Sequence, residues 1–140
     1  MREARPIVVI DSYRPTRVSM EEILRDAGYR VAGRAPALTV GALAELRPAL
    51  LILELRRDNA DSTMLLLDQL RQRDATRDIA VVLTTTDIRL PHVFAEPLWH
   101  LGCTTLVKPF DVDRLLAHVG RVLERRGPRQ RTRGQLPLCV

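Results

Sequence analysis

Short apolar runs alternate with amphipathic stretches along most of the chain. The apolar runs are rich in β-branched and aliphatic residues, as buried parallel strands are, and they lie at residues 7–10, 50–53, 79–83 and 104–107, with a weaker run at 29–33. Apolar residues recur at helical spacing between these runs, at residues 15–27, 39–46, 62–73, 92–101 and 112–126. Strands separated by helical crossovers predict an α/β fold, with a five-stranded parallel sheet and helices on both faces.

Local signals set the ends of some of these elements. Gly28 ends the first helix, as a C-terminal glycine commonly does, and Ser62 is the expected N-cap of the third. Pro91 and Pro97 interrupt the stretch at 92–101, so we expect an irregular or shortened helix there. The inner stripe of the first helix is expected to consist of Val18, Ile23, Leu24 and Ala27.

Composition and charge narrow the class of protein. The 140 residues suffice for one domain, and no apolar run approaches the roughly 20 residues of a membrane span, so we expect a cytoplasmic protein. The net charge is +5, of which Arg129, Arg131 and Arg133 supply +3. We therefore expect a domain at residues 1–126 and a basic, flexible tail at 127–140.

Polar residues follow the predicted strands at their carboxyl ends. They are Asp11 and Ser12, Glu54, Thr84 to Thr86, and Lys108. Because ligand sites of doubly wound sheets form at this edge, the candidate functional site lies here. No Gly-rich phosphate loop and no Ser nucleophile motif accompanies it, which weighs against an enzyme of small-molecule metabolism.

The segment before the predicted last helix is similar to a segment of a known protein family. The segment Gly102-Cys103-Thr104-Thr105-Leu106-Val107-Lys108-Pro109-Phe110 resembles the fifth strand of response-regulator receiver domains, with the family's lysine and the proline that follows a cis peptide bond. Residues 26–31 and 46–53 resemble further segments at the family's spacing. The resemblance covers residues 6–126. It implies the flavodoxin-like (CheY-like) doubly wound fold, with five parallel strands in the order 2-1-3-4-5 and a cis bond before Pro109.

Receivers of this family use three carboxylates to hold Mg²⁺, and one of them, an aspartate, accepts the phosphoryl group. On the resemblance, Asp11 is the first acid, Ser12 replaces the second, and Glu54 stands at the position of the phosphoacceptor. The longer side chain of Glu54 moves its carboxylate outward by about 1.5 Å. Arg56 or Arg57, in the same loop, can compete with a metal for a carboxylate. A metal site of Asp11 and Glu54 is therefore weak, and we predict no cofactor and no ordinary aspartyl phosphorylation.

The same resemblance assigns the remaining pocket residues. Thr85 best matches the hydroxyl that binds the phosphoryl group in the family, with Thr84 and Thr86 as alternatives, and Lys108 matches the family's lysine. One hypothesis is an ion pair between Glu54 and Lys108 that imitates the phosphorylated state. The alternative is that Glu54 is a solvated acid in an inactive pocket, because an exposed pair contributes only about 0–1 kcal/mol.

The resemblance implies a stand-alone, atypical response-regulator receiver that is not an enzyme and acts in signal transduction through protein–protein contacts. The expected partner is a sensor kinase, an effector or regulator, or a second copy of the chain. The family's interaction surface, formed by its fourth helix, fifth strand and last helix, corresponds to residues 92–126. Its candidate residues here are Trp99, Thr105, Phe110 and His118.

Two alternatives stay open at this point. The chain can be a phosphorylatable regulator with a non-standard acceptor, which is Glu54 or, less favoured, Asp58 or Asp61. It can also be a nucleic-acid-associated regulator that uses the basic residues 127–134. The nearly balanced charge of the rest of the chain is unlike the broad basic face of a dedicated DNA binder.

Overall fold

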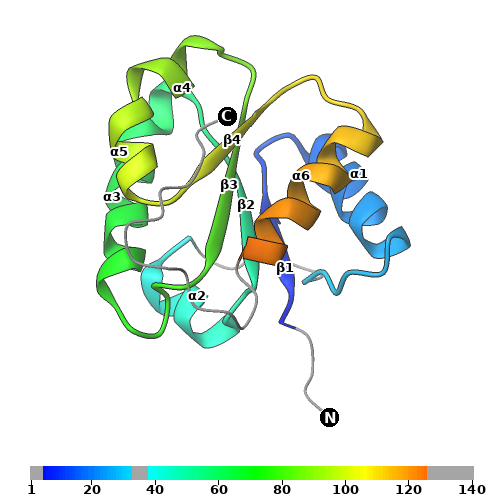
Figure 1. The fold of residues 1–140 in the computed structure, drawn as a ribbon, viewed down its shortest axis with the longest axis horizontal. Helices are drawn as coiled ribbons and strands as arrows, with labels where there is room; N and C mark the ends of the chain where they lie inside the picture. Colours follow the sequence, from blue (N-terminus) through cyan, green and yellow to red (C-terminus); the bar gives the residue numbers. More distant parts are fainter. Residues whose placement is uncertain (1–4, 33–37, 126–140) are drawn as a thin grey trace.

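The structure is a computed structural model that describes residues 5–32 and 38–125. Within these residues, four parallel strands form one sheet in the order β1-β2-β3-β4 (Figure 1). They are β1 (Ile7–Ile10), β2 (Leu50–Glu54), β3 (Ala80–Thr85) and β4 (Thr104–Val107). The two central strands are apolar almost throughout because both of their faces are covered.

Helices cover both faces of this sheet. They are α1 (Arg14–Asp26), α2 (Val40–Leu46), the 3₁₀ turn η1 (Arg57–Asn59), α3 (Ala60–Gln72), α4 (Arg89–Val93), α5 (Ala95–His100) and α6 (Val112–Arg125). In Figure 1, α1 and α6 lie on one side of the strands, and α2, α3, α4 and α5 lie on the other. The predicted α/β architecture is therefore confirmed, with the described helices divided between the two faces.

Strand residues alternate between two cores. Leu51, Leu53 and Leu83 belong to the core under α2 to α5. Leu50 and Ile52 belong to the core under α1 and α6. Because side chains of a strand alternate with a period of two, this assignment also fixes the face on which each residue at the carboxyl end of a strand projects.

The predicted strand at residues 29–33 is wrong as a strand. Among its described residues, only Val31 bridges to β1, in parallel with Ile7. The Ile7 N–H donates to the Arg30 carbonyl at 2.8 Å, and the Ala32 N–H donates to the Ile7 carbonyl at 3.0 Å. The bridge stands beside β1, where the order 2-1-3-4-5 places the second strand. An edge segment has only one neighbour to pair with, and its exposed arginine offers little apolar surface to hold it there.

Two local predictions also fail. Ser62 is not the N-cap of α3, because η1 leads directly into the helix at Ala60 and leaves Asn59 at the cap position. The Ser62 hydroxyl instead donates to the Asn59 carbonyl at 3.0 Å. Ala27 is exposed rather than part of the inner stripe, because it forms the C-cap where the chain leaves α1.

The structure also bears on the helix predicted over residues 92–101, on membrane spans and on the predicted tail. The irregular helix over 92–101 is confirmed as two short helices, α4 and α5, that meet at Phe94. None of the helices in the described residues is long and apolar enough to cross a membrane. The tail at 127–140, including the basic residues of the nucleic-acid alternative, lies outside the described residues.

Candidate functional site

The carboxyl ends of three strands bring Asp11, Glu54 and Lys108 together. Asp11 follows β1, Glu54 ends β2, and Lys108 follows β4, with a cis peptide bond between Lys108 and Pro109. The Lys108 Nζ lies 3.0 Å from Asp11 Oδ2 and 3.4 Å from Glu54 Oε2. The side chains of Asp11, Glu54 and Lys108 are 0%, 13% and 15% exposed, so water screens these contacts only in part.

Both carboxylate oxygens of Asp11 already accept hydrogen bonds. Oδ1 accepts from the backbone N–H of Tyr13 at 2.9 Å, which is the local turn that an aspartate side chain commonly makes two residues onward. Oδ2 accepts from Lys108. Asp11 is thus oriented from both sides and leaves no oxygen without a protein donor.

Glu54 is held still more extensively. Its Oε1 accepts from the Ser12 N–H at 3.1 Å, the Ser12 hydroxyl at 2.8 Å and Arg56 Nη1 at 2.9 Å. Burial raises the pKa of Glu54, but the hydrogen bonds from Ser12 and Arg56 and the charge of Lys108 outweigh it, so the pKa is lowered below its ordinary value. Ser12, which replaces an acid in the family comparison, therefore serves as a donor to Glu54.

Arg56 fastens the turn after β2 to the pocket. Its Nη1 contacts Glu54, and its Nε donates to Asp58 Oδ1 at 2.8 Å. Asn59 closes the turn, because its Oδ1 accepts from the Arg56 N–H at 2.7 Å and its Nδ2 donates to the Glu54 carbonyl at 3.0 Å. Of the two arginines in this loop, Arg56 contacts Glu54, whereas Arg57 Nη2 lies 3.8 Å from the carboxylate of Asp87.

The structure separates the threonines at the end of β3. Thr84 pairs with Glu54 in the sheet register, so both side chains project on the face of α1 and α6. Thr85 projects on the opposite face, where its hydroxyl oxygen accepts from the Asp87 N–H at 3.1 Å. The Thr85 carbonyl accepts the Lys108 N–H at 2.7 Å, which ties the end of β3 to the residue after β4. In this register the Thr84 side chain lies on the same face of the sheet as Glu54.

The donor set does not fit a magnesium ion. Mg²⁺ requires several hard oxygen ligands in near-octahedral geometry. Across residues 5–32 and 38–125, no group of three or more His, Cys, Asp or Glu side chains is placed to hold a metal. The two candidate ligands, Asp11 and Glu54, accept from Lys108, Ser12 and Arg56, which a metal would have to displace.

The four residues predicted for the interaction surface lie around β4, an edge strand of the described sheet. Trp99 on α5 and Thr105 on β4 are both half-buried. Phe110 packs against the core under α1 and α6. His118 on α6 is half-buried, and its Nε2 lies 2.9 Å from Thr104 Oγ1. These residues thus belong to α5, β4, the turn after β4 and α6.

Two residues of the site were missed in the sequence. Asn59 closes the turn around Arg56, and its place before a helical stretch was the available signal, because asparagine is a preferred N-cap. The Asp87 carboxylate, in the loop after β3, forms ion pairs with Arg57 and Arg89. The local signal was an aspartate two residues before an arginine, because the Arg89 N–H also donates to Asp87 Oδ1 at 3.0 Å; the contact with Arg57 is long-range and had no such signal.

Comparisons with known proteins support the fold. No protein-family model and no curated protein sequence matches the chain. Among solved structures, the chain is similar to the chemotaxis protein CheY4 of Vibrio cholerae, with 21% identity and a TM-score of 0.70 over 86% of this chain and 99% of that one. It is also similar to the signal receiver domain of a response regulator from Bermanella marisrubri, with 21% identity and a TM-score of 0.69 over 86% and 99% of the two chains.

A third similar structure extends over more of the chain. It is the receiver domain of a signal transduction histidine kinase from Syntrophus aciditrophicus, with 21% identity and a TM-score of 0.65 over 96% of this chain and 100% of that one. The three structures are receiver or CheY proteins of two-component signalling. The chain therefore has the flavodoxin-like, CheY-like receiver fold.

Proposed function

We propose that the chain is a receiver-like signalling module that acts through protein–protein contacts and does not depend on aspartyl phosphorylation. The observation that carries this proposal is the occupation of the pocket acids. Each carboxylate oxygen of Asp11 and Glu54 accepts at least one hydrogen bond from the protein itself. These donors occupy lone pairs that in-line attack or metal coordination would use, most fully at Glu54 Oε1, which accepts three hydrogen bonds.

The chemistry of Glu54 supports the same proposal. Its low pKa keeps it ionised at neutral pH, but that charge is already neutralised by Arg56 and Lys108. In-line attack would require the carboxylate to shift within these contacts, and a misplacement of about 1 Å can lower the rate about a hundredfold. The proposal accordingly includes no bound metal and no cofactor.

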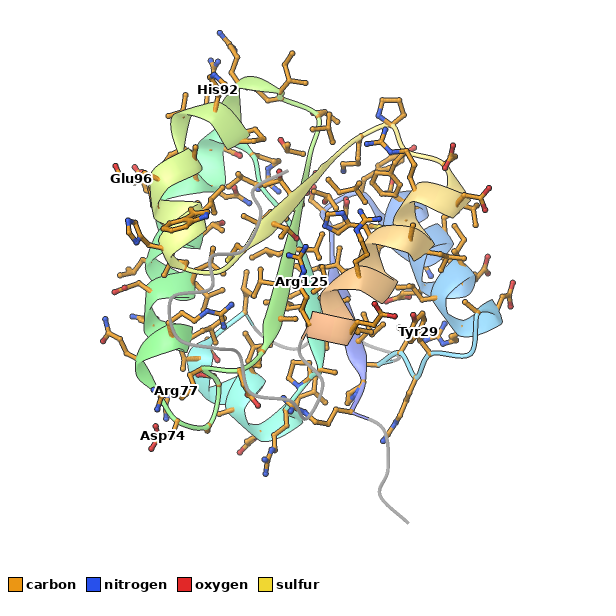
Figure 2. The ribbon with its side chains drawn as sticks, in the orientation of Figure 1. Tyr29, Asp74, Arg77, His92, Glu96 and Arg125 are labelled. Atoms are coloured by element: carbon orange, nitrogen blue, oxygen red, sulfur yellow. The ribbon has the colours of Figure 1, made fainter. Side chains whose placement is uncertain are left out.

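The surface proposed for partner binding consists of α4, α5, β4 and α6. Two of its helices expose apolar side chains. Val93 on α4 is 69% exposed, and Val112 on α6 is 48% exposed. Figure 2 shows His92 on α4 and Glu96 on α5 directed away from the sheet, and Arg125 at the end of α6. We infer a cytoplasmic protein partner, such as a kinase, effector or regulator, or a second copy of the chain.

The charge on α6 favours a partner with acidic groups. Arg114, Arg121 and Arg125 surround His118 at helical spacing, so they lie on one side of the helix. None of these three guanidinium groups forms an ion pair with a carboxylate among the described residues. Charged groups of this kind mainly set the association rate and select the partner.

The direct test is intact-mass spectrometry after incubation with acetyl phosphate and Mg²⁺. The wild-type chain is expected to stay unmodified, and Glu54→Asp is the matched variant because it shortens the acceptor by one methylene. Labelling of Glu54→Asp alone would show that the acceptor's length blocks the reaction and would leave the proposal standing. A phosphoryl group on the wild-type chain, lost in Glu54→Gln, would overturn the proposal in favour of a phosphorylatable Glu54.

A further inference from the structure

The contacts of Arg56 suggest a specific role for this arginine within the pocket. Its guanidinium bridges two carboxylates of different residues, at 2.9 Å from Glu54 Oε1 and 2.8 Å from Asp58 Oδ1. We propose that Arg56 is a resident cation that takes the place of a divalent metal ion at this pocket and excludes such an ion from it. The inference concerns the pocket of the proposed function, but it is a claim about cation binding rather than about phosphoryl transfer.

The charged groups in contact around the pocket sum to −1, with Arg56 supplying one of the two positive charges. Asp11, Glu54 and Asp58 contribute three negative charges, and Lys108 and Arg56 contribute two positive charges in direct contact with them. Without Arg56, Glu54 and Asp58 would each lose a cation in contact with them. The net charge of the pocket would then be more negative by one unit, which favours a divalent cation. With Arg56 in place, a metal ion on Glu54 Oε1 would stand within a few ångströms of a like charge.

The geometry of the turn holds the guanidinium in this position. The Arg56 N–H donates to Asn59 Oδ1, and Asn59 Nδ2 donates to the Glu54 carbonyl, so the backbone on both sides of the arginine is tied. The planar fork of arginine then reaches both acids with separate nitrogen atoms. Since Asn59 bonds only the backbone of Arg56, removal of the Arg56 side chain leaves this part of the turn intact.

Ser12 also disfavours a metal ion at this pocket. Its hydroxyl donates to Glu54 Oε1, the same oxygen that Arg56 contacts. A carboxylate at residue 12 would be a metal ligand, whereas the hydroxyl and N–H present there are donors that compete with a metal for the oxygen. The pocket therefore has a hydroxyl at residue 12 where a metal would use an acid, and an additional cation, Arg56.

Arg57 offers a matched control. It carries the same charge one residue further along the chain, its side chain is 70% exposed, and it points to Asp87 instead of Glu54. Arg57→Ala changes the net charge by the same amount as Arg56→Ala without freeing an oxygen of Glu54. Arg56→Lys keeps the charge and tests whether the cation itself excludes the metal.

The experiment is a titration of the full chain with Mn²⁺, followed by paramagnetic broadening of the backbone amide signals of Ser12 and Glu54. Arg56→Ala is expected to bind Mn²⁺ about tenfold or more tightly than wild type, because the repulsion of a divalent ion by an adjacent guanidinium is removed. Arg57→Ala and Arg56→Lys are expected to stay near the wild-type affinity. Circular dichroism of each variant establishes that it is folded.

Three results would overturn the inference. They are wild-type binding as tight as that of Arg56→Ala, an equal gain in Arg57→Ala, or an equal gain in Arg56→Lys. Mn²⁺ binding decides this inference alone, and labelling by acetyl phosphate decides the proposed function, so failure of one is distinguishable from failure of the other.

Discussion

The ammonium group of Lys108 lies 3.0 Å from Oδ2 of Asp11, whose side chain is fully buried. Lys108 is the single lysine of the chain, in which every other residue with a permanently positive side chain is an arginine. Its compact charge suits a position between two acids, because Nζ also lies 3.4 Å from Glu54 Oε2. The pocket thus contains a buried ion pair that links the end of β4 to the ends of β1 and β2.

Replacement of this lysine is expected to destabilise the protein. Lys108→Met would leave Asp11 buried without its cation, which costs about 3 kcal/mol for a buried pair that loses one partner. The double variant Lys108→Met/Asp11→Asn removes both charges and should regain a large part of that loss. Urea denaturation at neutral pH measures both, and a single variant as stable as wild type would show that the pair contributes nothing.

Glu54 should make stability depend on pH in the acidic range. Burial raises its pKa, but the bonds from Ser12 and Arg56 and the charge of Lys108 lower it below the ordinary value of 4.5. A carboxyl group whose pKa is lowered on folding stabilises the fold above the unfolded pKa, and this stabilisation is lost as the pH falls through the folded pKa. The difference in unfolding free energy between wild type and Glu54→Gln should therefore be constant above pH 4.5 and shrink below it. A difference that grows on acidification contradicts this assignment.

His118 gives a second pH dependence at higher pH. Burial lowers its pKa below 6.5, and the charges of Arg121, Arg125 and Arg114 lower it further. The unfolded chain therefore binds this proton more readily, so His118 makes the folded state less stable as the pH falls from 6.5 toward the folded pKa. His118→Gln should flatten the stability profile in that window, as followed by urea denaturation. A wild-type imidazole that titrates above 6.5 in an NMR titration would reverse the predicted sign.

Two buried threonines should respond oppositely to the same substitution. The Thr84 hydroxyl has no hydrogen-bond partner among the described residues, whereas the Thr76 hydroxyl donates to the Leu70 carbonyl at 2.7 Å. Thr84→Val is expected to leave stability unchanged or raise it, because an unpaired buried hydroxyl is replaced by a methyl group of similar size. Thr76→Val is expected to lower stability by about 1–2 kcal/mol, because the Leu70 carbonyl loses its donor. Thermal unfolding of the two variants checks the contrast, and an equal loss in both would refute it.

Much of the fold follows from local pattern. The buried runs at 50–53 and 104–107 become β2 and β4 with nearly the predicted bounds, since short apolar runs suit strands covered on both faces. The weak run at 29–33 is the exception, because pairing at an edge depends on a neighbour that the local sequence does not specify. The start of α3 was also misplaced, since η1 begins the helical path before Ser62.

The apolar pattern was enough to predict which chemical groups meet at the edge of the sheet. An acid after β1, a glutamate at the end of β2 and a lysine after β4 were readable because parallel strands present their carboxyl ends at one edge. It did not determine which arginine reaches Glu54, nor which threonine shares its face. Those outcomes depend on the direction of single side chains, which is set by the turn at Asn59 and by the register between β2 and β3. They required the tertiary structure, because successive side chains of a strand project on opposite faces of the sheet and a shift of one residue in register reverses the face.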